Sequence, residues 1–133
     1  MTSRLIFCSL LALAVTGALL TSGRPAAALD SDANASLIAR GQYLTGDAGQ
    51  CADCHRPNFV GGPNLVPGPP GAPWAKTVPS LRGLKMFAND ADAVAFLHTA
   101  KLPNGQTALR PMPHYNFSVP DAGAIVAYLR SLE

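Results

Sequence analysis

Five consecutive residues constrain the fold of this 133-residue chain more than any other feature: Cys51-Ala52-Asp53-Cys54-His55. Two thiols three positions apart, followed at once by an imidazole, have the spacing that attaches a c-type haem. Each thiol can add to one vinyl group at the porphyrin edge, which places the macrocycle beside the backbone. The next residue then lies under the iron, where a neutral imidazole binds axially. We therefore expect one covalent haem c, attached through Cys51 and Cys54, with His55 as an iron ligand.

The first 28 residues have the pattern of an export signal. Arg4 provides an early positive charge, residues 5–20 are almost continuously apolar, and Ala26-Ala27-Ala28 supplies the small residues that a signal peptidase recognises. The apolar run is short for a helix that spans a membrane. We therefore expect a cleaved signal peptide over residues 1–28, a mature protein that begins at Leu29 and a periplasmic location. The alternative is an uncleaved segment that anchors the protein to the membrane.

Removal of this leader changes the cysteine count and the charge. Cys8 leaves, so both remaining thiols belong to the haem motif and no structural disulfide can form. Arg4 and Arg24 also leave, so 8 basic side chains balance 8 acidic ones. This balance argues against a nucleic-acid partner, which would need a basic surface. The mature residues, 29–133, are expected to form one domain, whose small core a buried haem would complete.

Three segments have the pattern of amphipathic helices: residues 33–44, 91–99 and 120–132. Residues suited to helix capping precede all three, namely Asp30 to Asp32, Asn89 or Asp90, and Ser118. In the first helix, Leu37, Gly41 and Leu44 share one face. Glycine inside a helix costs about 1 kcal/mol relative to alanine, so Gly41 indicates a point where another helix approaches closely. The buried face of the last helix is expected to contain Ile125, Tyr128, Leu129 and Leu132.

Residues 57–83 cannot form a long helix, because they contain seven prolines and five glycines. A loop of this length in a small domain is usually either functional or disordered. Seven apolar side chains in it could line a haem edge, so we expect an ordered wrap around the cofactor. These side chains are Phe59, Val60, Leu65, Val66, Trp74, Val78 and Leu81. The Trp74 N–H could reach a haem propionate or a backbone carbonyl.

The iron face opposite His55 needs a second ligand or remains open. A thioether sulfur at that position raises the reduction potential and suits electron transfer. Met112 is the predicted ligand, because prolines on both sides keep its backbone extended and can present its side chain to the iron. The alternatives are Met86, which could instead fill a gap in the core, and the two other histidines, His98 and His114. An open distal face would indicate a haem enzyme or sensor, such as a peroxidase.

Together these features resemble a class I cytochrome c over residues 33–132. The resemblance rests on Gly41 in the first helix, the haem motif, the Pro/Gly-rich loop, Pro111-Met112-Pro113 and Ala127-Tyr128-Leu129. More narrowly, Gly61-Gly62, Leu102-Pro103-Asn104-Gly105 and Pro111-Met112-Pro113-His114-Tyr115 are similar to cytochrome c subunits of bacterial periplasmic dehydrogenases. Such relatives often carry three haems, whereas this chain has one attachment motif and is expected to carry one haem.

The resemblance implies an all-α fold of about three main helices around the haem, in which Gly41 of the first helix meets Tyr128 of the last. It also implies that a backbone carbonyl accepts the ring N–H of His55. Pro63 matches the segment that supplies this accepting carbonyl in the family. The carbonyl of Pro79 is the alternative acceptor. The implied function is that of an electron carrier, not an enzyme. Its partners would be a donor dehydrogenase and a terminal acceptor, such as an oxidase or another cytochrome.

Overall fold

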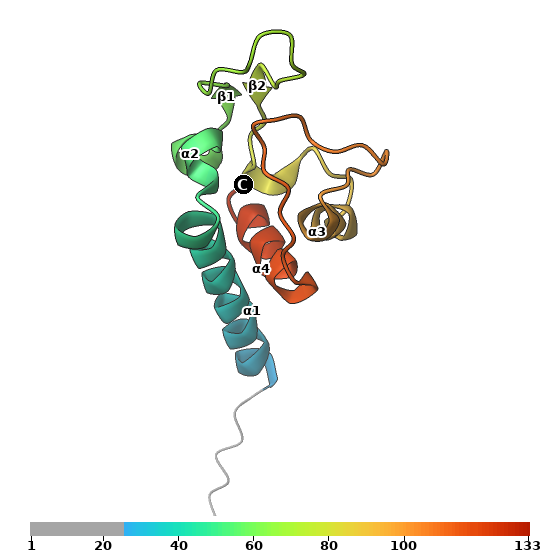
Figure 1. Cartoon of the computed structure of the whole chain (residues 1–133). Coiled ribbons are helices and arrows are strands. Elements are labelled where there is room, and N and C mark those ends of the chain that lie inside the picture. The colour runs from blue at the N-terminus through green and yellow to red at the C-terminus, as the bar shows by residue number, and fades with distance from the viewer. Residues whose placement is uncertain (1–25) are drawn as a thin grey trace, which may run out of the picture.

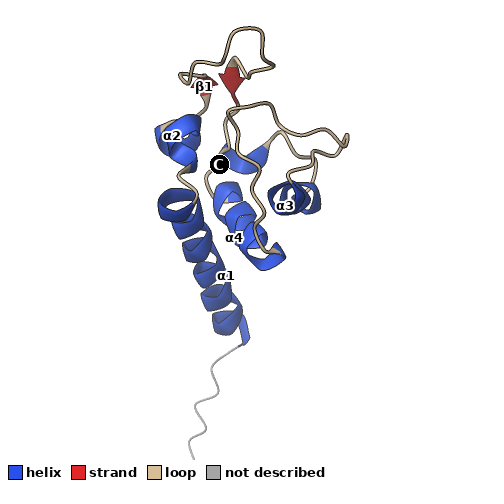
Figure 2. Ribbon diagram, in the orientation of Figure 1, coloured by secondary structure: helices blue, strands red, loops and turns tan. Residues whose placement is uncertain are grey.

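The structure is a computed structural model that describes residues 26–133, and it is mostly helical (Figures 1 and 2). The helices are α1 (Ala26–Tyr43), α2 (Cys51–His55), α3 (Asp90–Thr99) and α4 (Val119–Arg130), and the strands are β1 (Gly62–Pro63) and β2 (Thr77–Val78). Single turns of other helix types occupy Leu44–Ala48, Pro57–Phe59 and Arg82–Leu84. The predicted all-α class is confirmed, with one short hairpin added.

The predicted signal peptide, residues 1–28, lies outside the described residues except for its last three positions. Helix α1 begins at Ala26 and runs through Asp30 to Asp32, so the expectation that these residues cap the helix is wrong. No glycine or proline occurs from Ala26 to Arg40, so nothing in the local sequence stops the helix from extending toward its N-terminus. None of the helices in residues 26–133 is both long enough and apolar enough to cross a membrane.

Helices α1 and α4 cross at Gly41, as the family resemblance implies. A Cβ atom on Gly41 would lie 2.0 Å from the carbonyl oxygen of Ala124 and 2.7 Å from the Cβ of Tyr128, so only glycine allows this approach. Leu44, on the same face, is buried. Leu37 lies one turn earlier on the predicted face but is 41% exposed, so this face is buried only toward the end of the helix. In Figure 1, α4 lies against the C-terminal half of α1 and leaves the first half uncovered.

Helix α4 lies between α1 and α3 and supplies much of the core (Figure 1). The buried apolar cluster is Leu44, Phe59, Leu84, Phe87, Ala93, Ala124, Ile125, Val126 and Leu129. Of the predicted face of α4, Ile125 and Leu129 are buried, while Tyr128 and Leu132 are half-buried at its edge. Both predicted caps are present: the side chains of Asn89 and Ser118 accept hydrogen bonds from backbone N–H groups in the first turns of α3 and α4.

The Pro/Gly-rich loop folds as an ordered hairpin. Gly62 pairs with Val78 and Pro63 with Thr77, in antiparallel register. The Trp74 indole N–H donates to the carbonyl of Val66 at 2.9 Å, so a backbone carbonyl is its partner. The expectation that the loop is ordered is therefore confirmed.

Candidate haem site

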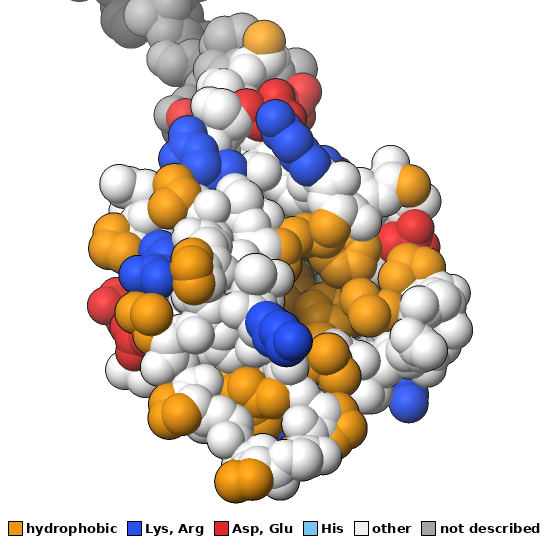
Figure 3. All heavy atoms as spheres, turned by 90° about the horizontal axis from the view of Figure 1, so that it is seen from above, with side chains coloured by type: hydrophobic (Ala, Val, Ile, Leu, Met, Phe, Trp, Pro, Cys, Tyr) orange, Lys and Arg blue, Asp and Glu red, His pale blue; other side chains and the backbone are white. Residues whose placement is uncertain are grey.

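A cavity of about 560 Å³ lies between α2, the hairpin, α3, α4 and the loop that precedes α4. Figure 3 shows it as a hollow with hydrophobic side chains on its floor and rim. Its volume falls within the range of about 300–1,000 Å³ that is usual for small-molecule and cofactor sites. Large apolar residues form most of its wall: Leu81, Leu84, Phe87, Phe96, Leu97 and Leu129. Such a wall suits the apolar body of a porphyrin.

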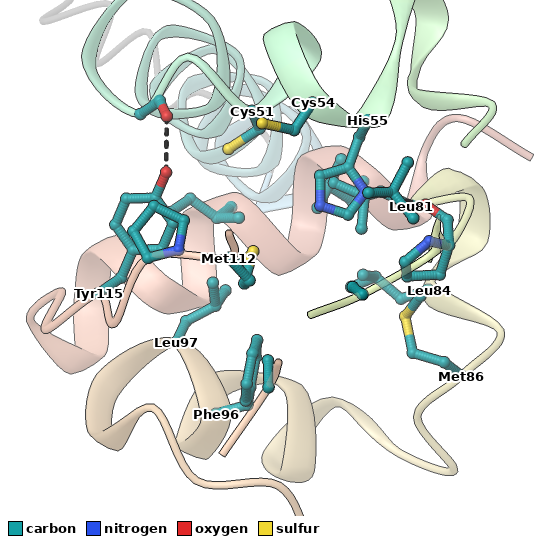
Figure 4. A pocket seen from close by; sticks show the side chains of 18 of the residues that line it. Cys51, Cys54, His55, Leu81, Leu84, Met86, Phe96, Leu97, Met112 and Tyr115 are labelled. Carbon is teal, nitrogen blue, oxygen red and sulfur yellow. Dashed lines mark hydrogen bonds between the residues drawn. The ribbon is translucent and has the colours of Figure 1, made fainter. Parts of the chain in front are cut away.

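Cys51, Cys54 and His55 all line this cavity from the short helix α2 (Figure 4). The helix lies between two residues with positive φ angles, Gln50 at 48° and Arg56 at 72°. Residues other than glycine adopt such backbone angles at a cost of about 1–3 kcal/mol. Residues with such strained backbones cluster at functional sites. Sharp turns at both ends therefore confine the five-residue helix and direct the motif toward the cavity.

Burial and one hydrogen bond give the His55 imidazole the neutral form and the tautomer that a metal ligand needs. Its side chain is buried, and Nδ1 donates to the carbonyl oxygen of Pro79 at 2.8 Å. Because a carbonyl only accepts, Nδ1 carries the proton and Nε2 is left with a free lone pair for a metal. Burial lowers the pKa of the imidazole from its usual 6.5, and the hydrogen bond to Pro79 opposes this shift. The neutral form, which binds iron, is thereby favoured.

The structure thus selects Pro79 over Pro63 as the carbonyl that orients His55. The Pro63 carbonyl instead accepts a hydrogen bond from Arg56 Nη2 at 3.1 Å. Gly61 allows the segment that bears Pro79 to approach closely, because a Cβ on Gly61 would lie 2.5 Å from the backbone nitrogen of Ser80. The Gly61-Gly62 pair noted in the sequence therefore has a specific role: its first glycine allows the chain to return to His55.

Met112 lines the same cavity from the loop before α4, as the sequence predicts for the second ligand. Met86 also lines it, but that side chain is 42% exposed, so its expected alternative role as a core filler is wrong. In Figure 4 Met86 lies on the side of Leu81 and Leu84, whereas Met112 lies on the side of Tyr115. Met112 and Met86 therefore line different sides of the cavity.

The two remaining histidines do not line the cavity. His98 is engaged at the end of α3, where its Nδ1 donates to the carbonyl of Phe117 at 2.7 Å. His114 is exposed and borders a separate, shallower hollow beside Trp74. Their placement therefore favours a methionine over either histidine as the second ligand.

Most of the apolar side chains expected from the Pro/Gly-rich loop do not reach the haem cavity. Val78 and Leu81 line it, and Phe59 lies in the core. Val60, Leu65 and Val66 are 42–72% exposed, because the hairpin carries them away from the body of the molecule. Helix α3 supplies Phe96 and Leu97 to the wall in their place. The predicted wrap around the cofactor is therefore only partly correct.

Tyr115 is a residue of the site to which the sequence analysis assigned no role. It lines the cavity, and its hydroxyl donates to the carbonyl of Gly49 at 2.8 Å. Burial raises the pKa of this phenol, and it likewise raises the pKa of the Cys51 thiol. An amphipathic aromatic side chain three positions after Met112 was the available signal, but its partner lies 66 residues earlier in the chain.

The donor set fits a covalently bound haem. Two thiols lie at one edge of an apolar cavity, an imidazole has a free Nε2, and a thioether enters from another element. Fold and site together define a small helical protein that encloses one covalent haem c. The sequence matches the family model described as Cytochrome c over residues 38–133, so the chain belongs to the cytochrome c family. Comparisons with curated proteins and with solved structures gave no match.

Membership of this family confirms the predicted c-type cytochrome, its covalent haem and its general class as a haem-based electron-transfer protein. The narrower likeness to dehydrogenase subunits stays a prediction. So do the division into residues 1–28 and 29–133 and the assignment of individual iron ligands.

Proposed function

We propose that this protein is a periplasmic mono-haem electron carrier with His55 and Met112 as axial ligands. It passes one electron at a time between a donor dehydrogenase and a terminal acceptor, such as an oxidase or another cytochrome. The observation that carries the proposal is that His55 and Met112 line one cavity from different elements, next to both cysteine thiols. When bound, the haem supplies reversible one-electron chemistry at its iron, and ligation by His and Met raises its reduction potential.

The chain's own groups support this role. The thiols of Cys51 and Cys54 fix the porphyrin edge, and the Pro79 carbonyl fixes the plane and tautomer of His55. The apolar wall excludes water from the faces of the haem. Two protein ligands that stay in place leave little to rearrange when the charge on the iron changes.

The competing function, a haem enzyme or sensor with an open distal face, receives less support from the cavity. Peroxide activation relies on polar hydrogen-bond donors in the distal pocket. Beside Met112, the lining includes the apolar residues Leu97, Leu109 and Pro113, together with Tyr115. The Tyr115 hydroxyl already donates to Gly49, so its proton is engaged.

Substitution of the proposed second ligand tests this function. We expect Met112→Ala to keep the covalent haem, lose the far-red absorption band of the sulfur–iron bond, lower the reduction potential and bind cyanide. Met86→Ala is the matched control, since it removes the other thioether at the cavity and should keep the band. Survival of the band in Met112→Ala would show that Met112 is not the ligand. Rapid cyanide binding or peroxide turnover by the unmodified ferric protein would instead indicate an open site.

A further inference from the structure

Backbone hydrogen bonds hold both ends of the segment 110–117, which carries Met112. At the first end, the N–H of Ala75 donates to the carbonyl of Arg110 at 2.7 Å. At the other end, the N–H of Phe117 donates to a carbonyl in α3 at 3.2 Å. Neither contact involves the part of the chain that attaches the haem. They fix the ends of the segment, but not its distance from α2.

The Tyr115 hydroxyl supplies that missing connection. Its hydrogen bond to Gly49, drawn in Figure 4, joins the segment 110–117, called here the methionine loop, to the turn two residues before Cys51. Among the described residues, 26–133, it is the one side-chain hydrogen bond between the segment 111–117 and the turn before α2. The Tyr115 ring also stacks on Phe117, with 5.1 Å between ring centroids and 24° between planes, which limits the positions the hydroxyl can take.

The geometry of this contact favours a mechanical role over a redox one. The acceptor is a backbone carbonyl, which cannot take up the phenol proton, so oxidation of Tyr115 would have no base beside it. A hydrogen bond to a rigid acceptor does, however, fix a distance. Gly49 is such an acceptor, because its own N–H is bonded to the Leu44 carbonyl at 2.8 Å and a Cβ on Gly49 would lie 2.7 Å from that same oxygen.

We propose that Tyr115 is a positioning residue that holds Met112 on the iron by tying the methionine loop to the turn that leads into the haem-attachment helix. This inference rests on the proposed ligation by Met112. Without the hydroxyl, the loop opens more readily, and the sulfur spends more time off the metal. One neutral hydrogen bond changes such an equilibrium about two- to tenfold.

Competition by imidazole measures this equilibrium in the ferric holoprotein. We expect Tyr115→Phe to raise the apparent affinity for imidazole about two- to tenfold, to weaken the sulfur–iron band and to leave the covalent haem content unchanged. Tyr43→Phe is the matched control. Tyr43 is 51% exposed on α1, and its hydroxyl makes no hydrogen bond within residues 26–133, so this variant should behave like the unmodified protein.

Three outcomes would overturn the inference, and they differ from one another. Unchanged imidazole affinity in Tyr115→Phe, with the band lost in Met112→Ala, refutes the positioning role alone. A band that persists in Met112→Ala refutes the ligand assignment and the inference with it. Finally, Gly41→Ala destabilises the crossing of α1 and α4 and leaves the Tyr115 hydroxyl in place. If that variant raised imidazole affinity as much as Tyr115→Phe, the effect would reflect general loss of stability.

Discussion

Replacement of Gly41 by alanine tests the packing that places α1 against α4. Alanine is the better helix former by about 1 kcal/mol, so helix propensity alone predicts a gain in stability. The new Cβ, however, would lie 2.0 Å from the carbonyl oxygen of Ala124 and 2.6 Å from its carbonyl carbon. Both are backbone atoms of α4, so no side chain can rotate away and the helices must separate. Overpacking of this kind typically costs about 1–3 kcal/mol, and its backbone location puts Gly41→Ala at the upper end.

The net expectation is a loss of about 2 kcal/mol, which lowers Tm by about 8–16 °C in a domain of roughly 100 residues. Thermal unfolding of the holoprotein, followed by circular dichroism, measures it. Gly123→Ala is the matched control: Gly123 lies inside α4, and a Cβ there would meet no other part of the described chain within 4 Å, so helix propensity should raise Tm. If Gly41→Ala proved as stable as the unmodified protein, the argument from close approach would fail.

Two further predictions concern the hairpin and the N-terminus. Gly61 and Gly71 both have positive φ, 73° and 76°, so alanine costs about 1–2 kcal/mol at either; only at Gly61 does a clash with Ser80 add about 1–3 kcal/mol. Gly61→Ala should therefore lower Tm clearly more than Gly71→Ala, and equal losses would contradict the proposed return of the chain to His55. Mass spectrometry of the purified exported protein should find Leu29 at its N-terminus, and Met1 would indicate an uncleaved anchor.

Much of the local structure could be predicted because it depends on near neighbours. The second and third main helices begin where Asn89 and Ser118 can cap them, and both caps are observed. The density of proline and glycine in residues 57–83 ruled out a long helix there. The predicted start of α1 is wrong, since Asp30 to Asp32 suit a cap but are also tolerated within a helix.

The haem site was predictable to the extent that covalent chemistry dictates it. The spacing of Cys51, Cys54 and His55 is set by the dimensions of the porphyrin, so it is visible in five residues. The structure adds that Met112 lines the cavity and that His98 and His114 do not, which no spacing could decide. Met86 shows the limit of such arguments, because the sequence allowed it to fill a gap in the core and the structure leaves it 42% exposed.

The sequence by itself determined the haem attachment, the helical class and the glycine at the helix crossing, since each follows from bond geometry or from residues within one or two turns. Only the tertiary structure decided that Pro79 orients His55, that the hairpin turns Val60, Leu65 and Val66 outward, and that Tyr115 reaches Gly49. The hydrogen bond of Tyr115 joins residues 66 positions apart in the sequence, and the hydrogen bond of His55 joins residues 24 positions apart. Contacts over such separations depend on how the long loop closes around the cavity, and a local pattern carries no information about that closure.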